Sequence, residues 1–359
     1  MPDTPPDIAA RKADHIQLCL AEDVGFQQKT TLLEEVELIH DALPELAVAD
    51  IDLRTTIFGR TLQAPLIISA MTGGTVRAIE INRDLARVAQ ELGVGFAFGS
   101  QRPLLLKGIR DGYEVRDVAP DALIFGNIGV VQARETDTAR LRAMLDATGA
   151  DALCVHLNPA MEVVQPEGDD DFRGGLDTIR RLIGELGRPV IVKETGCGLS
   201  RRLGERLRGA GVTWVDTSGA GGTSWVGVET RRAADGQRAL GARFWDWGIP
   251  TAASVAQLDG LGLGIIATGG VAHGLDAARA VALGATCAGI ARPFLQAQAL
   301  GYAALRTAVA EVIAEIRVAC LLTGSRTPAD LRKQPLQVGP RLRRWVPTGG
   351  ELEGRLLGG

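Results

Sequence analysis

The most chemically informative stretch begins with a short apolar run, Ala152 to Val155, which has the length of a buried strand. An imidazole, an amide and a carboxylate follow at His156, Asn158 and Glu162. Pro159 cannot continue a central strand because it has no N–H group. The pattern predicts that the chain leaves a sheet here and carries Glu162 into a loop, with the chemistry just past the end of the strand.

Lys193 directly follows a second apolar run, Val190 to Val192. An ammonium group at the end of a buried strand needs an acceptor, because a buried charge without a partner is costly. Ring atoms of a cofactor could supply that acceptor, and so could Glu194 or another carboxylate of the same fold. We favour the cofactor.

Three glycine-rich clusters follow other apolar runs, at residues 218–224, 268–270 and 288–292. Any one of them is equally compatible with a simple turn. Three such clusters at strand ends favour a phosphate bound through backbone N–H groups.

A basic helix is predicted near the start of the chain, from Ile8 to Leu20. It carries Arg11, Lys12 and His15, and the last two are three residues apart, so they project from neighbouring points on one face. Spacing alone favours a solvated basic face over an anion site.

These side chains require a scaffold, and the sequence beyond Pro65 repeats a short apolar run and an amphipathic helix eight times over about 230 residues. Most runs are uniformly apolar, as parallel strands buried on both faces must be. A polar or glycine cluster follows almost every run, which favours an α/β fold of the (β/α)8 TIM-barrel type over a doubly wound open sheet with one switch point. The predicted strands are Leu66–Ser69, Gly95–Phe98, Ala122–Phe125, Ala152–Val155, Val190–Val192, Trp214–Asp216, Gly264–Ala267 and Cys287–Ile290.

Three regions are expected along the chain. Residues 1–60 form an N-terminal extension with the basic helix, residues 61–322 form the barrel with a C-terminal helix over Tyr302–Leu322, and residues 323–359 form a tail. An outer helix of the barrel is expected at Leu176–Leu186, where leucine and isoleucine form one stripe. The last part of the tail, residues 340–359, is rich in glycine and arginine, and we expect it to be mobile.

The amino-acid composition and charge of the chain indicate its general class of protein. Hydrophobic residues make up 46% of the 359 residues and charged residues 23%, as in an ordinary globular enzyme, and the formal charge of -4 gives no basic field for nucleic acid. No apolar run approaches the roughly 18 residues of a membrane helix, and no apolar leader opens the chain. The five cysteines are scattered along the chain and none belongs to a CxxC pair, so we expect them to be reduced. We therefore expect a cytoplasmic protein without nucleic-acid or membrane partners.

Several short motifs occur between residues 11 and 225: Arg11-Lys12-x-x-His15, Met71-Thr72-Gly73-Gly74, Gly99-Ser100-Gln101-Arg102, Gly126-Asn127-Ile128-Gly129, His156-Leu157-Asn158-Pro159, Val164-Gln165-Pro166-Glu167-Gly168, Lys193-Glu194-x-Gly196-x-Gly198 and residues 218–225. Together they resemble the type 2 isopentenyl diphosphate isomerase family, and the resemblance spans roughly Arg11 to Leu295. The resemblance implies a flavin-binding TIM barrel that interconverts isopentenyl and dimethylallyl diphosphate without net redox change. It also implies reduced FMN, Mg2+, NADPH as reductant and a homo-oligomer, either a tetramer or an octamer.

The resemblance also assigns roles to residues. Glu162 matches the Mg2+ ligand, and Glu229 and Trp225 match residues near the proton transfers. The substrate diphosphate is expected at Arg11, Lys12, His15, Ser100, Gln101, Arg102, His156 and Asn158. FMN is expected at Met71, Thr72, Gly73, Ser100, Asn127, Lys193, Ser218, Thr223, Gly269, Gly270, Ala288 and Gly289.

Met161 departs from the family, which has a glutamine beside the reacting alkene at this place. A thioether is a weak acceptor with no proton to give, so it cannot do the work of an amide. Ala272 stands where an arginine or similar polar residue is expected.

Three hypotheses fit these departures. In the first, Glu229 or Trp225 and the flavin carry the proton transfers, and Met161 only slows isomerisation. In the second, Met161 enlarges the apolar wall for a modified or longer allylic diphosphate. In the third, the barrel is an FMN oxidoreductase or a flavoprotein without turnover. A hydroxy-acid oxidase of this third class would need a histidine base, for which His273 is the best spare candidate, although an exposed loop position suits it better.

Overall fold

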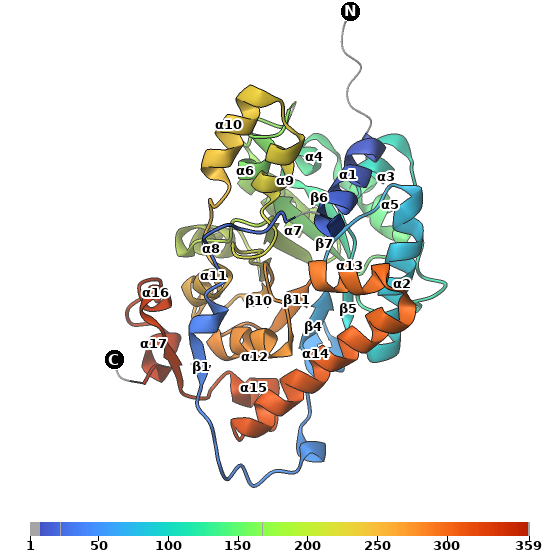
Figure 1. The fold of residues 1–359 in the computed structure, drawn as a ribbon. Coiled ribbons are helices and arrows are strands. Elements are labelled where there is room, and N and C mark those ends of the chain that lie inside the picture. Colours follow the sequence, from blue (N-terminus) through green and yellow to red (C-terminus); the bar gives the residue numbers. More distant parts are fainter. Residues whose placement is uncertain (1–7, 22, 167, 358–359) are drawn as a thin grey trace, which may run out of the picture.

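The structure is a computed structural model that describes residues 8–21, 23–166 and 168–357, without the side chains of residues 8–13 and 21. Within these residues, eight parallel strands form a closed barrel with helices around it, which confirms the predicted TIM barrel (Figure 1). Neighbouring strands follow one another in sequence around the barrel, as βαβ units require. The strands are β4 (Leu66–Ile68), β5 (Gly95–Ala97), β6 (Ile124–Gly129), β7 (Ala152–Leu157), β8 (Val190–Glu194), β9 (Trp214–Asp216), β10 (Gly264–Ala267) and β11 (Cys287–Ile290).

The middle strands are longer than the apolar runs that predicted them. Strand β7 continues through His156, and β8 continues through Lys193, so these side chains lie within strands and not after them. His156 is in register with Gly129 of β6 on one side and with Lys193 on the other. The strands continue because pairing depends on the backbone, whereas the apolar pattern stops where side chains begin to face a ligand site.

The chain leaves the barrel at Pro159, as predicted, but it enters the short helix α6 (Pro159–Glu162) and not a loop. Proline suits the first helical position because the N–H it lacks would have no partner there. Met161 and Glu162 are therefore held on a helical turn.

Helices cover the outside of the barrel (Figure 1). Helix α7 (Gly175–Glu185) lies close to the predicted bounds, and its apolar stripe is buried at Ile179 and Leu182. The long helix α14 (Tyr302–Leu322) has the predicted bounds and packs on α12, α13 and α2. The helices that follow or flank the strands are α2 (Val76–Leu92), α3 (Arg102–Lys107), α4 (Val130–Glu135), α5 (Thr138–Thr148), α7 (Gly175–Glu185), α8 (Arg201–Gly209), α9 (Trp225–Arg232), α10 (Asp235–Phe244), α11 (Thr251–Leu258), α12 (Gly274–Leu283) and α13 (Arg292–Ala299).

A hairpin of β2 (Thr55–Ile57) and β3 (Arg60–Leu62) precedes the barrel. Phe58 at its turn packs against Phe125 and Trp214 of the barrel, with ring centroids 6.1 and 5.1 Å away. Residues 58 and 59 both have positive φ, as a tight two-residue hairpin turn requires. The hairpin places an aromatic ring against the inner wall of the barrel.

The tail pairs with the N-terminal extension: β1 (Val36–Leu38) and β12 (Leu336–Val338) form an antiparallel ladder. Beyond it, Leu342 and Leu352 are buried, so the prediction of a mobile tail is wrong for residues 340–357. Composition misled because a few buried leucines among many glycines and arginines are sufficient to anchor the segment. The remaining elements are α1 (Ile8–Ala21), η1 (Leu33–Glu35), η2 (Val48–Asp50), α15 (Pro328–Leu331), α16 (Pro340–Arg343) and α17 (Glu351–Arg355).

All five cysteines have free thiols, and four of them are buried. Among the residues described, no helix combines the length and the apolar character needed to cross a membrane.

Candidate functional site

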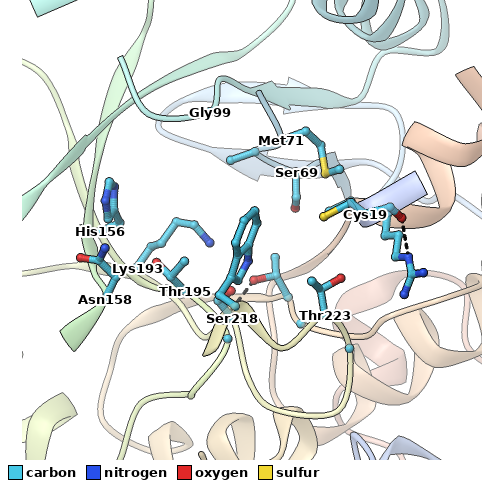
Figure 2. A pocket seen from close by; sticks show the side chains of 18 of the residues that line it. Cys19, Ser69, Met71, Gly99, His156, Asn158, Lys193, Thr195, Ser218 and Thr223 are labelled. Carbon is cyan, nitrogen blue, oxygen red and sulfur yellow. Dashed lines mark hydrogen bonds between the residues drawn. The ribbon is translucent and has the colours of Figure 1, made fainter. Parts of the chain in front are cut away.

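A cavity of about 460 Å3 opens at the carboxyl ends of the barrel strands (Figure 2). Residues in or just after all eight strands line it, and helix α1 contributes His15 and Cys19. The prediction that the polar clusters share one face is therefore confirmed.

Backbone lines one side of the cavity. A Cβ atom on Gly269 would lie 2.1 Å from the carbonyl oxygen of Gly219, and one on Gly222 would lie 2.4 Å from the nitrogen of Gly270. Gly269 and Gly270 also have positive φ, which glycine adopts without strain. The loops after β9 and β10 thus touch backbone to backbone, an arrangement that suits phosphate binding by N–H groups.

Three side-chain hydroxyl groups of the cavity are buried without a hydrogen-bond partner in the described part of the chain. The hydroxyl oxygens of Ser69, Thr72 and Thr195 are buried and have no hydrogen bond among the described residues, and all three side chains line the cavity. A buried polar atom without a partner costs roughly 1–3 kcal/mol. Together with the glycine wall, these hydroxyls fit a ligand such as FMN, which has a phosphate at one end and polar ring atoms at the other.

Lys193 extends from β8 into the cavity (Figure 2) and is only 8% exposed. Its Nζ lies 3.4 Å from Oδ2 of Asp216, so the nearest barrel carboxylate is at the limit of a contact. Glu194 accepts hydrogen bonds from the N–H groups of Thr195 and Cys197 instead. Burial raises the pKa of Glu194 to about 8, despite those hydrogen bonds and the charge of Lys193. The lysine therefore keeps capacity for a ligand.

His156 is oriented by Asn127. The Nδ2 of Asn127 donates to the carbonyl of Phe98 at 3.0 Å, so its Oδ1 faces Nδ1 of His156 at 2.8 Å. Because an amide oxygen only accepts, Nδ1 of His156 carries the proton in this contact. The imidazole is thus fixed at the mouth of the barrel.

Glu162, the last residue of α6, is held by residues on either side of that helix. Its Oε1 accepts a hydrogen bond from Asn158 at 2.6 Å, and its Oε2 accepts one from the N–H of Asp169 at 2.9 Å. The side chain is 8% exposed and lines the cavity. No cluster of three metal-ligating side chains occurs in the part of the chain that is described. A single carboxylate still suits Mg2+, which completes its shell with water and phosphate oxygens.

Helix α1 is attached to the cavity rim at two points. Near its middle, Nε2 of His15 lies 2.7 Å from Oε1 of Glu229, and the other oxygen of Glu229 accepts from Arg232 at 2.8 Å. Near its end, Nε of Arg292 donates to the carbonyl of Cys19 at 2.9 Å (Figure 2). Burial alone would raise the pKa of Glu229, but the hydrogen bond from His15 and the nearby charges lower it on balance.

The cavity includes many of the predicted site residues. They are His15, Met71, Thr72, Ser100, Arg102, Asn127, His156, Asn158, Met161, Glu162, Lys193, Ser218, Thr223, Trp225, Gly269, Gly270 and Gly289. Trp225 stands beside His15, with ring centroids 5.3 Å apart. One contiguous site therefore joins the glycine wall to the polar end.

Other predicted residues lie outside the cavity lining. Gln101 is fully buried beneath it and accepts from the N–H of Asn127. Gly73 packs on the ring of Tyr113, and Ala288 is buried within β11. Glu229 is also fully buried, and its contact with His15 links it to the cavity. Arg11 and Lys12 belong to α1, but their side chains fall outside the described residues.

Several lining residues were missed by sequence reasoning. Ser69 is the last residue of a predicted strand and Thr195 follows the end of another, so their position was a usable signal. Cys19 and Arg292 meet only because α1 folds back over the barrel, and no local pattern reveals such a contact between distant parts of the chain.

The chain has clear relatives. The family model described as FMN-dependent dehydrogenase matches residues 7–167 and 160–338. An isopentenyl-diphosphate delta-isomerase of Synechococcus is 47% identical over 90% of this chain and 94% of the relative. One of Methanothermobacter thermautotrophicus is 40% identical over 96% of this chain and 97% of the relative.

Solved structures share the fold at lower identity. A mandelate oxidase mutant with an FMN adduct has a TM-score of 0.65 and 18% identity, covering 90% of this chain and 95% of that one. Mandelate oxidase with a difluorinated hydroxy acid has a TM-score of 0.64 and 18% identity, covering 92% and 98%. From its sequence relatives and the matching family model, the chain belongs to the isopentenyl-diphosphate delta-isomerases of the FMN-dependent, type 2 family.

Proposed function

We propose that this protein is an FMN-dependent isomerase that interconverts isopentenyl diphosphate and dimethylallyl diphosphate, with Mg2+ on the diphosphate. One observation carries the proposal: a single cavity joins a glycine wall suited to a phosphate with a polar end built from His156, Asn158 and Glu162. A flavin phosphate and a substrate diphosphate thus find separate anchoring groups in one space. The names of the relatives agree with this use of the site.

The glycine wall and the barrel centre would hold FMN. Gly269 and Gly270 would present backbone to its phosphate, and Lys193 would meet polar ring atoms. The hydroxyl of Thr72, which has no partner among the described residues, would offer a further contact. When bound and reduced, with NADPH as the proposed source of electrons, FMN supplies acid–base groups beside the substrate. The protein's own contribution is to orient these groups and to exclude water from them.

The polar end would hold the substrate diphosphate. Arg102 and His156 line it, and Nε of Arg102 is buried without a partner among the described residues. His15 faces the same cavity from α1, the helix that also carries Arg11 and Lys12. Charge-assisted contacts of this kind fix a diphosphate in place. Glu162 is the proposed Mg2+ ligand.

The hydrocarbon end of the substrate would lie against Trp225 and Met161, which also line the cavity. Glu229 is placed to act through His15, because its carboxylate contacts that imidazole and not the cavity. We propose that Glu229 holds the imidazole of His15 in position beside the bound diphosphate.

A second candidate substrate is a longer or modified allylic diphosphate. Met161 favours it, since a flexible thioether adapts to bulkier apolar groups. Ala272, Val271 and Leu295 add small or apolar surface to the same cavity. No comparable observation favours an oxidase: His273 caps α12 through a hydrogen bond from the N–H of Asp276 and is not among the lining residues.

The experiment is product analysis by NMR. The protein is loaded with FMN, reduced chemically without oxygen, and supplied with Mg2+ and, in separate samples, isopentenyl diphosphate or a longer allylic diphosphate. We expect dimethylallyl diphosphate as the product. Conversion of a longer allylic diphosphate alone would support the second candidate, and conversion of neither would refute both.

We also propose that the protein is cytoplasmic and that, as the resemblance implies, it assembles as a tetramer or an octamer. Light scattering coupled to size exclusion measures the mass of the assembly. A mass of one chain would refute the proposed assembly.

A further inference from the structure

Gln165 has a buried amide that the proposed roles leave unused. The side chain is 4% exposed and lines the cavity, yet its Oε1 has no hydrogen-bond partner among the described residues. An acceptor left in this state costs roughly 1–3 kcal/mol, so it is expected to find a donor on a ligand.

The backbone places Gln165 one helical turn after Met161. Its N–H donates to the carbonyl of Met161 at 3.0 Å and lies 3.2 Å from the carbonyl of Glu162. Residues four apart on such a turn share a face. The amide is therefore held on the wall that also carries the proposed Mg2+ ligand, and the cavity receives all three side chains.

The chemistry of the substrate indicates which of its two ends Gln165 contacts. A prenyl chain has neither donors nor acceptors, so it cannot satisfy a buried amide. The diphosphate oxygens accept hydrogen bonds, and the water that Mg2+ retains in its shell donates them. An amide has an oxygen that accepts and an NH2 group that donates, which matches both needs.

We propose that Gln165 binds the hydrated Mg2+–diphosphate end of the substrate, with Oε1 accepting from a metal-bound water and Nε2 donating to a diphosphate oxygen. Met161 on the preceding turn then faces the hydrocarbon end. This inference rests on the proposed function, because it assumes a prenyl diphosphate with Mg2+ in the cavity.

The test is calorimetric binding of isopentenyl diphosphate to the oxidised, FMN-loaded protein at a series of Mg2+ concentrations. Gln165→Met keeps the length of the side chain and removes the amide. We expect its half-saturating Mg2+ concentration to rise at least about tenfold, as loss of a hydrogen bond to a charged group predicts. Gln337→Met, on the exposed edge of β12, is the matched control and should behave as the unaltered protein.

A second variant distinguishes the loss of this contact from a simple folding defect. Gln165→Glu retains the size and adds a charge beside the cation, so its half-saturating Mg2+ concentration should fall below that of the unaltered protein. An unchanged Mg2+ dependence in both variants overturns the role of Gln165. If the unaltered protein binds no isopentenyl diphosphate at any Mg2+ concentration, the proposed function fails and the role of Gln165 fails with it.

Discussion

At the scale of single residues, Lys193 gives the clearest test of where FMN binds. Its ammonium is buried in the cavity, and its nearest described carboxylate, Asp216, lies at 3.4 Å. We predict that Lys193→Ala weakens FMN binding at least about tenfold, because a charge-assisted hydrogen bond is worth about 1.5–3 kcal/mol. Fluorescence titration of FMN measures the affinity. Lys333→Ala, on an exposed position, is the control, and an equal affinity in all three proteins would contradict the placement of the flavin.

Met161 tests the choice of substrate. An amide beside the alkene would contribute through orientation or proton relay, effects worth about 10²-fold for a positioned acid–base group. We predict that Met161→Gln raises activity on isopentenyl diphosphate and lowers it on any larger native substrate. Rate over apparent affinity for each substrate is measured without oxygen on chemically reduced protein. Lower activity on isopentenyl diphosphate would show Met161 to be an accepted variant, and unchanged activity would show that the side chain does not face the alkene.

The sequence located residues of the cavity lining well where chemistry and position coincide. His156 and Lys193 are polar side chains at the end of apolar strands, a pattern with few explanations other than a site. Gln101 has the same signal but lies beneath the cavity, because a strand end also needs amides to satisfy buried backbone. Only the packed structure separates these two uses.

At the scale of elements, helix α1 depends on the barrel for its position. His15 contacts Glu229, and Arg292 contacts the end of the helix. We predict that Glu229→Gln weakens this docking, so hydrogen exchange in residues 14–21 accelerates and the substrate KM rises. Asp14→Asn is the control, since its contact with Arg232 is long and exposed and contributes little. Unchanged exchange together with a loss of kcat would instead assign Glu229 to proton transfer.

The docking should also depend on pH. The folded-state pKa of Glu229 is lowered from its ordinary value of 4.5. A carboxylate with a lowered pKa contributes its full stability above the unfolded pKa, and that contribution is lost as pH falls through the folded pKa. Protection of α1 should therefore decline below about pH 4.5 in the unaltered protein, and Glu229→Gln should remove that decline.

Element bounds were predicted best where the strand holds only apolar or small residues. Strands β9, β10 and β11 have the predicted bounds, whereas β6, β7 and β8 run further into the polar clusters. The hydrophobic pattern shows whether side chains face the core or a polar site. The backbone pairing of a strand continues past the residue at which the apolar pattern ends. The hairpin β2–β3 was not predicted, because its two strands of three residues are too short to show a period.

At the scale of the whole molecule, the two ends of the chain stabilise each other through β1 and β12. Leu342 is fully buried just beyond this ladder. We predict that Leu342→Ala lowers the free energy of unfolding by about 2–5 kcal/mol, as removal of a buried leucine does. Chemical denaturation measures it. Leu357→Ala, which is 49% exposed, is the matched control; a loss below about 0.5 kcal/mol, typical of a surface change, would mean that the tail does not support the fold.

The barrel itself followed from repetition in the sequence, because eight similar units restrict the topology strongly. The fold of the tail could not be predicted in this way, because contacts such as that of Arg341 with Glu34 join residues far apart in sequence. Long-range ion pairs and short ladders depend on the assembled fold. Repetition along the sequence therefore predicts the barrel, whereas local composition fails for the segments that fold through contact with it.

The ratio of nicotinamide oxidised to product formed tests the central claim most directly. Isomerisation moves protons and leaves the oxidation state of the substrate unchanged, so NADPH should be needed only to reduce the flavin once. With Mg2+, isopentenyl diphosphate and excess NADPH in the absence of oxygen, we predict many turnovers to dimethylallyl diphosphate for each NADPH oxidised. Oxidation of one NADPH for each product molecule would contradict an isomerase and identify an oxidoreductase.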